Sequence, residues 1–203
     1  MVLLAAGFIL SLFGSIPPGL ISLTVAQTSI ARGWTAAIAL AMGAALAEFF
    51  QAWAAVLLTD WFLSHQGAER GFHWAAVPVF FTLGFYLVFF AKPPLPPGQM
   101  TQATLRGQFL KGLVVSFFNL LAVPYWFVYC GWLRMEGWWQ EGLLPTLVFS
   151  LGVSLGTMFA LGLYAWLGQL VLRRSNEVAR YANWVIGAIF LGLGLKTLIG
   201  LIF

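Results

Sequence analysis

Residues 1–31 read MVLLAAGFILSLFGSIPPGLISLTVAQTSIA and contain no charged side chain. A helix needs about 20 apolar residues to cross the hydrocarbon core of a bilayer, so this run is long enough for one crossing. No basic segment precedes it and the run is longer than a signal sequence, so we expect no cleaved signal peptide. The opening of the chain therefore predicts a membrane protein.

The composition of the whole chain agrees with this interpretation. Of 203 residues, 61% are hydrophobic and 8% are charged, whereas soluble domains carry about 25% charged residues. Ten Trp and 19 Phe suit aromatic belts at the two membrane interfaces. The net charge of +4 is small and its basic residues are scattered. Lipid is therefore an expected partner and nucleic acid is not.

Long apolar runs, free of charge except for Glu48 in the first and Lys196 in the last, place the other crossings at about 34–59, 74–91, 112–133, 144–172 and 181–203. These runs are continuous and lack the alternation of a β-barrel strand. We predict an all-α integral membrane protein with about six transmembrane helices.

Basic residues in the connections predict the orientation of these helices. Seven of them follow crossings one, three and five, and two follow crossings two and four. Basic loops stay on the cytoplasmic side, so we expect a multi-pass protein of the cell (inner or plasma) membrane with both termini extracytoplasmic. The seven are Arg32, Lys92, Arg106, Lys111, Arg173, Arg174 and Arg180, and the two are Arg70 and Arg134.

A Pro-rich linker over 93–110, predicted to be cytoplasmic, divides the chain into halves of three crossings, 1–92 and 111–203. An odd number of crossings places the two halves in opposite orientation, as in the inverted repeats of many secondary transporters. The first helix of each half is predicted to be broken at proline, at Pro17-Pro18-Gly19 and at Pro124. Such transporters bind substrate where the repeats meet.

The break at Pro18-Gly19 is the strongest candidate for a binding site. The half-helix that follows would direct free N–H groups and a positive partial charge inward, toward a substrate carboxylate. The alternative is a packing kink, which is favoured for Pro124 taken alone. The candidate substrate-binding residues are Ser15, Pro18, Gly19, Gln27, Asn119 and Pro124.

Glu48 lies near the middle of the second crossing. Placing a carboxylate there costs about 3 kcal/mol on insertion scales, so such residues are usually functional. Ala44, Ala47 and Gln51 share its helix face and allow another helix to approach. We interpret Glu48 as a proton-coupling residue; the alternative is a structural Glu, protonated or hydrogen-bonded between helices.

Several other chemistries are not indicated. Cys130 is the single cysteine, and His65 and His73 fall in a predicted loop, so no metal site is expected. Neither a nucleophile–base pair within the crossings nor a phosphate-binding loop occurs, so we expect neither an enzyme nor a cofactor. Gly152 and Gly156 are predicted to serve helix packing.

The segment Gly14-Ser15-Ile16-Pro17-Pro18-Gly19-Leu20, followed by Gly43-Ala44-Ala45-Leu46-Ala47-Glu48, resembles the opening of LysE-type translocators. In that superfamily of lysine and threonine/homoserine exporters, a Pro-Gly-Pro break precedes a Gly-x-x-x-Gly-Asp stretch. Glu48 occupies the aspartate position with its charge kept. The run at 119–126 is similar to the family's Asn-Pro-Lys segment, with Pro124 matched and Val123 and Tyr125 in place of Asn and Lys. The similarity extends to the last helix.

This resemblance implies a secondary active transporter that exports amino acids or related small polar metabolites, coupled to the proton or another cation gradient. It also implies the inverted repeat. The lost Lys removes a cationic contact, so lysine is not specifically implied. The alternatives are a metal-ion exporter of the same superfamily, a non-transporting accessory or structural membrane protein and, third, an intramembrane enzyme. The expected partner is a small-molecule solute, and the sequence leaves a homodimer open.

Overall fold

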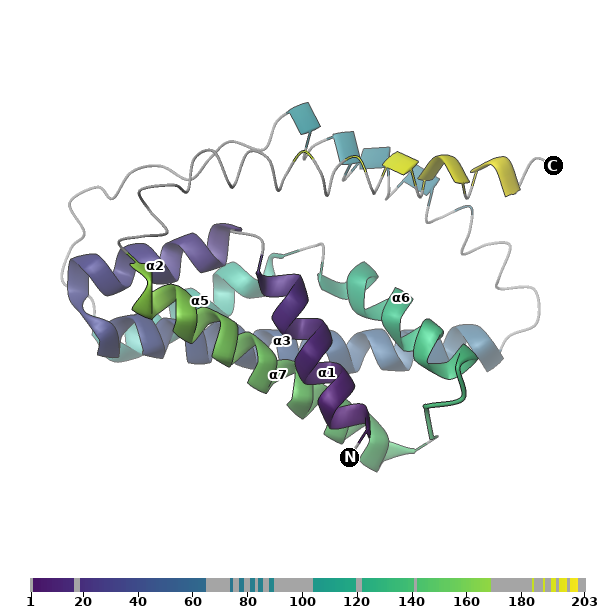
Figure 1. Cartoon of the computed structure of the whole chain (residues 1–203), viewed down its shortest axis with the longest axis horizontal. Helices are drawn as coiled ribbons and strands as arrows, with labels where there is room; N and C mark the ends of the chain where they lie inside the picture. Colours follow the sequence, from purple (N-terminus) through teal and green to yellow (C-terminus); the bar gives the residue numbers. More distant parts are fainter. Residues whose placement is uncertain are drawn as a thin grey trace.

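The computed structural model describes residues 2–16, 19–64, 104–119, 122–140 and 142–168, with isolated helical positions within 74–89 and 184–200. The described segments form α1 (Val2–Ser15), α2 (Leu20–Arg32), α3 (Trp34–Ser64), α5 (Leu105–Phe117), α6 (Ala122–Met135) and α7 (Leu143–Trp166), with no strand among them (Figure 1). The predicted all-α class is confirmed for this part of the chain.

Two helices, α3 and α7, are each long and apolar enough to cross a membrane. The pairs α1–α2 and α5–α6 pass the same test together, so the described segments supply two to four crossings. The predicted crossings at 74–91 and 181–203 lie outside the described residues apart from isolated positions. The number six therefore stays a prediction.

Both predicted breaks are present. The axes of α1 and α2 differ by 77° and those of α5 and α6 by 64°. The prediction that Pro124 itself kinks a helix is wrong, because Pro124 is the third residue of α6 and the break precedes it. A proline is tolerated in a first turn, where the backbone N–H has no partner within the helix. Pro17 and Pro18 lie outside the described residues.

The start of α5 also differs from the prediction. This helix begins at Leu105, within the linker expected over 93–110, and not near residue 112. The Thr104 hydroxyl accepts a hydrogen bond from the Gly107 backbone N–H at 3.2 Å. Threonine at this position satisfies one of the unpaired donors of a helix N-terminus, which explains why the helix starts here.

The first long helix follows α2 after a single residue. Gly33 has φ +86° and its N–H donates to the Ser29 carbonyl oxygen at 3.0 Å. A left-handed residue of this kind ends a helix, and glycine adopts it without steric cost. The chain therefore reverses at once, and α2 packs against α3.

The two long helices contact each other, and each contacts the first half-helix of the opposite half: α1 lies on α7 and α5 lies on α3 (Figure 1). Glycines form both of these crossings. A Cβ atom on Gly43 would overlap the Phe109 carbonyl oxygen, and one on Gly152 would overlap that of Leu4. Small residues allow such close backbone approach between membrane helices. The predicted packing role of Gly152 and Gly156 is confirmed, since a Cβ on Gly156 would overlap the Phe8 carbonyl oxygen.

Aromatic and aliphatic side chains fill the core between α3, α6 and α7. Trp126 of α6 stacks edge-on against Phe149 of α7, with ring centroids 5.8 Å apart. Val56 of α3 belongs to the same buried cluster. This cluster holds α6 beside the two long helices.

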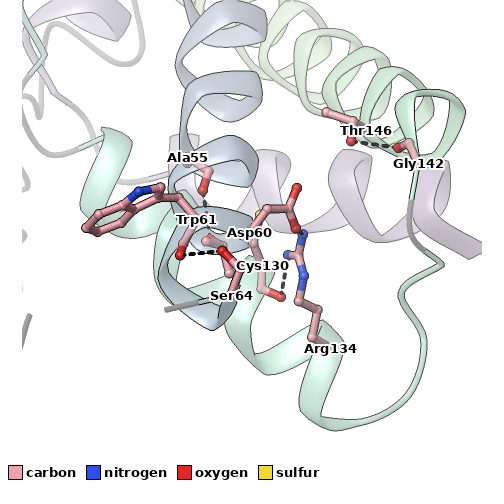
Figure 2. Close-up of polar contacts among 9 residues, drawn as sticks. Ala55, Asp60, Trp61, Ser64, Cys130, Arg134, Gly142 and Thr146 are labelled. Carbon is pink, nitrogen blue, oxygen red and sulfur yellow. Dashed lines mark hydrogen bonds and ion pairs between the residues drawn. The ribbon is translucent and has the colours of Figure 1, made fainter. Parts of the chain in front are cut away.

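A charged contact joins the ends of α3 and α6. Asp60 forms an ion pair with Arg134, and Figure 2 shows the two side chains facing each other. The Arg134 guanidinium also donates to the Cys130 carbonyl oxygen at 3.3 Å and lies 4.3 Å from the centroid of the Trp139 ring. Ring and carbonyl fix the arginine in place, so the ion pair connects two defined helix ends. The sequence analysis did not single out Asp60.

We predict that Gly43→Ala destabilises the protein by about 1–3 kcal/mol, because the new methyl group forces α5 away from α3. Gly131→Ala is the matched control. Gly131 lies in helix α6, and its Cβ would meet no described atom within 4 Å. Thermal unfolding in detergent checks this: the Gly43 variant should melt earlier, and the Gly131 variant at or slightly above the parent. Equal midpoints for both variants would contradict the close crossing.

Candidate functional site

Glu48 lies midway along α3 and is half-buried. Its carboxylate accepts a hydrogen bond from the hydroxyl of Thr157 on α7. The Thr157 hydroxyl also lies 2.7 Å from that of Ser11 on α1. Three helices from both halves of the chain therefore meet at one carboxyl group.

The Thr157 hydroxyl has more partners than protons. Besides Glu48 and Ser11, the Val153 carbonyl oxygen lies 3.1 Å from it. A hydroxyl has one proton to donate and two lone pairs to accept with, so it can donate to only one of these acceptors at a time. Ser11 is 1% exposed and Thr157 is 3% exposed, so water does not compete freely for either.

One turn beyond Glu48, Gln51 covers the break between α5 and α6. Its Nε2 donates to the Ser116 and Phe117 carbonyl oxygens at 3.0 and 3.2 Å, and reaches that of Asn119 at 3.5 Å. The last carbonyls of a helix have no partner within it, and Gln51 supplies one. Its own Oε1 is buried with no hydrogen-bond partner among the described atoms.

Two tyrosines from the second half donate hydrogen bonds to backbone carbonyls in or just after α1. The Tyr164 hydroxyl, on α7, donates to the Ile16 carbonyl oxygen. The Tyr125 hydroxyl, on α6, donates to the Leu10 carbonyl oxygen at 2.8 Å, and its ring lies against Gly14. The Ile16 carbonyl and the last carbonyls of α5 are therefore capped from the opposite half of the chain, and Tyr125 adds a bond to a carbonyl within α1.

The predicted substrate-binding residues lie in several places. Ser15 is the last residue of α1, and Gly19 precedes α2 with extended backbone and no side-chain cap on that helix. Asn119 lies in the second break, where its carbonyl faces Gln51. Gln27 is buried within α2, and Pro124 lies in the first turn of α6. Pro18 lies outside the described residues.

Of these candidates, the structure brings Asn119 close to the face of α3 that carries Glu48. Sequence analysis missed Ser11, Thr157 and Tyr164, because each alone reads as an ordinary helix residue. A signal for Thr157 does exist in the sequence. It follows Gly152 and Gly156 with the spacing by which Glu48 follows Gly43 and Ala47.

The same spacing relates the two halves more widely. The helix starts Trp34 and Leu143 are 109 positions apart, as are Gly43 and Gly152, and Glu48 and Thr157. The helix starts Leu20 and Ala122 are 102 positions apart, as are Arg32 and Arg134 near the ends of α2 and α6. Glu48 and Thr157 thus lie at the same distance from the starts of α3 and α7, and they bond to each other.

Within the described segments, no group of three His, Cys, Asp or Glu side chains lies close enough to hold a metal ion. Both histidines predicted to lie in a loop, His65 and His73, fall outside those segments. Cys130 is a free, buried thiol in α6.

Comparison with protein families matched the family model described as LysE type translocator over residues 12–201. Comparisons with curated proteins and with solved structures gave no match. The family match covers nearly the whole chain, from the last turn of α1 through both breaks and both long helices, and confirms the resemblance found in the motifs. The chain belongs to the LysE type translocator family.

Proposed function

We propose that this chain is a secondary active transporter that exports amino acids or related small polar metabolites by alternating access, coupled to the proton gradient through Glu48. Membership of a translocator family and its membrane-length apolar helices identify it as a membrane protein that moves small molecules. Substrate, coupling and mechanism are the proposal.

The observation that carries the proposal is the setting of Glu48. Its hydrogen-bond partner among the described residues is the neutral hydroxyl of Thr157, and no cation pairs with it there. A carboxylate without a fixed counter-charge in a membrane interior is costly. It gains from binding either a proton or a cationic group, and can release it when its surroundings change. Alternating exposure of such a group is what proton-coupled transport requires.

The relation between the two halves supports alternating access. Two broken helices and two long helices recur in the same order, and each first half-helix lies on the long helix of the other half. We interpret this as an inverted repeat with Glu48 and Thr157 at its centre. Exchange of conformation between two inverted repeats opens a central site to one side and then to the other.

The broken helices supply the seat for the solute in this proposal. The N-terminus of α2, at Gly19, has no side-chain cap, so its N–H groups are available to a carboxylate. Ser15 at the end of α1 would line this seat together with Pro18. Gln27, Asn119 and Pro124 would contribute to the remaining wall. A solute held there by its carboxylate would lie between the breaks and Glu48.

We predict that Glu48→Gln abolishes pH-gradient-driven transport while the protein still folds, because glutamine can accept the Thr157 hydrogen bond but cannot carry a proton. The measurement is uptake of a mixture of radiolabelled amino acids into proteoliposomes, with and without an imposed pH gradient. Glu136→Gln is the control, since Glu136 is an exposed acid after the end of α6 and its variant should match the parent.

Undiminished gradient-driven transport by Glu48→Gln would disprove the coupling role. If the parent protein, folded and inserted, moves no amino acid with or without a gradient, the substrate lies elsewhere in the small polar metabolites, or the chain is an accessory protein.

We also predict the orientation in the cell membrane, with both termini extracytoplasmic. In a Cys130→Ala background, Glu136→Cys should react with a membrane-impermeant maleimide in intact cells. Leu105→Cys should react only after the membrane is permeabilised. Both positions are exposed in the structure, and neither change removes a basic residue, so the charge bias that sets orientation is kept. The reverse labelling pattern would invert the proposed topology.

A further inference from the structure

We propose that Ser11 and Thr157 are positioning residues for Glu48, forming a hydroxyl chain through which the protonation of that carboxyl group depends on the contact between α1 and α7. This inference rests on the proposed proton-coupling role of Glu48 and adds to it the groups that control the proton. It starts from the two hydrogen bonds that connect Ser11, Thr157 and Glu48 across three helices.

When Glu48 is ionised, its carboxylate can only accept. The Thr157 proton is then committed to Glu48, so the Ser11 hydroxyl must be the donor in the 2.7 Å contact between Ser11 and Thr157. Both hydroxyls then point their protons along the chain toward the carboxylate. Hydrogen bonds donated to an ionised group are the strong ones and favour the charged form.

When Glu48 is protonated, its own hydroxyl can donate to Thr157. The Thr157 proton is then free to turn toward Ser11 or toward the Val153 carbonyl oxygen at 3.1 Å. Ser11 no longer has to donate to Thr157, and a helical serine can instead donate to a carbonyl of its own helix. One proton on Glu48 therefore reverses or releases the hydroxyl contact between α1 and α7.

The hydrogen bond between Ser11 and Thr157 lies where its reversal can affect the packing of α1 on α7. Close to it, α1 and α7 touch through backbone, because Gly7, Gly152 and Gly156 bring the two helices together without side chains between them. Ser11 itself lies against Gly156. The rings of Phe8 on α1 and Phe159 on α7 pack beside this crossing, with centroids 5.9 Å apart. The hydrogen bond between Ser11 and Thr157 adds a directional contact to this packing, so it contributes to the register of the two helices. Because α1 leads into the first break, its register affects the proposed solute seat.

A structural threonine offers the contrasting case. Thr59 is 1% exposed in α3, and its hydroxyl donates to the Ala55 carbonyl oxygen of its own helix at 2.7 Å. Thr157 has the equivalent bond to Val153, four residues back, and in addition contacts two polar side chains from other helices. Thr59→Val therefore removes the local bond alone, which makes it the matched control for Thr157→Val.

The other described ionisable groups near α3 either have partners of their own or form no ion pair with Glu48. The Tyr125 hydroxyl is engaged with the Leu10 carbonyl oxygen, and Asp60 with Arg134 at the helix end. No described ionisable group of α1, α2, α5, α6 or α7 forms an ion pair with Glu48. On the helices packed against α3 or bonded to its site, these groups are Arg32, Arg106, Lys111, Tyr125, Tyr129, Cys130, Arg134 and Tyr164.

The test measures the protonation of Glu48 directly, by infrared titration of the full-length protein in lipid. The carboxyl C=O band that is absent in Glu48→Gln identifies the group. We expect Thr157→Val to move the midpoint of this titration by about one pH unit to higher pH, a tenfold change in proton affinity. Ser11→Ala should move it in the same direction by less, and Thr157→Ser should restore the parent value. Thr59→Val should leave it in place.

Two results would overturn the inference: a Thr157→Val midpoint equal to that of the parent, or an equal shift in Thr59→Val. If Thr157→Val fails to insert into the membrane, Ser11→Ala becomes the deciding variant, because it removes only the hydroxyl farthest from Glu48. A Glu48 titration midpoint that Ser11→Ala leaves unchanged would reject the role of α1. The infrared readout needs no substrate. If Thr157→Val shifts the midpoint but Glu48→Gln transports normally, the hydroxyl chain stands and the proposed coupling role of Glu48 is rejected. If Glu48→Gln loses transport but the midpoints of the hydroxyl variants do not move, the coupling role stands and the hydroxyl chain is rejected.

Discussion

Backbone polar groups in an apolar environment need partners, and this requirement organises the described part of the chain. An unbroken helix satisfies its own carbonyls, but a helix that stops within a membrane leaves several exposed to hydrocarbon. Here two helices stop, at Ser15 and at Phe117. The capping groups are the amide of Gln51 and the hydroxyl of Tyr164, one from each long helix. The broken helices are therefore tied to α3 and α7, and no described segment of the bundle stands alone.

This arrangement also explains why polar side chains collect along the inner faces of the long helices. Gln51 is required there by the second break, and Glu48 lies one turn away on the same face. Glycines at the crossings bring α5 and α1 near enough for the caps to reach. The close approach of the helices, the capping of their ends and the position of the central carboxyl group thus depend on one another. Hydrogen bonds between membrane helices are individually worth only about 0.6–2 kcal/mol, so their joint placement matters more than any one of them.

The sequence was informative where a residue type has one physical meaning. Long apolar runs with at most one charge predicted α3 and α7 close to their observed bounds, Pro-Pro-Gly predicted the first break, and a lone carboxylate among small residues marked Glu48. The sequence was misleading at Pro124. A proline in the first turn of a helix and a proline that kinks a helix cannot be told apart unless the start of the helix is known. Leu105–Leu110 was assigned to a linker on the strength of the prolines before it, although Thr104 is a capping residue. Thr157 and Ser11 could not be recognised because their importance lies in contacts between distant parts of the chain.

The separation of those parts also bears on how the protein is made. Ser11 and its contact on α7 are 146 residues apart. At a synthesis rate of roughly 5–20 residues per second, the ribosome needs roughly 7 to 30 seconds after making α1 before Thr157 exists. Until α7 is made, the glycine face of α1 lacks its native neighbour, although Tyr125 of α6, which contacts Leu10, is made earlier. The helix α1 is thus made long before the helix that covers it, and the insertion machinery, lipid or a chaperone must shelter its glycine face until α7 arrives.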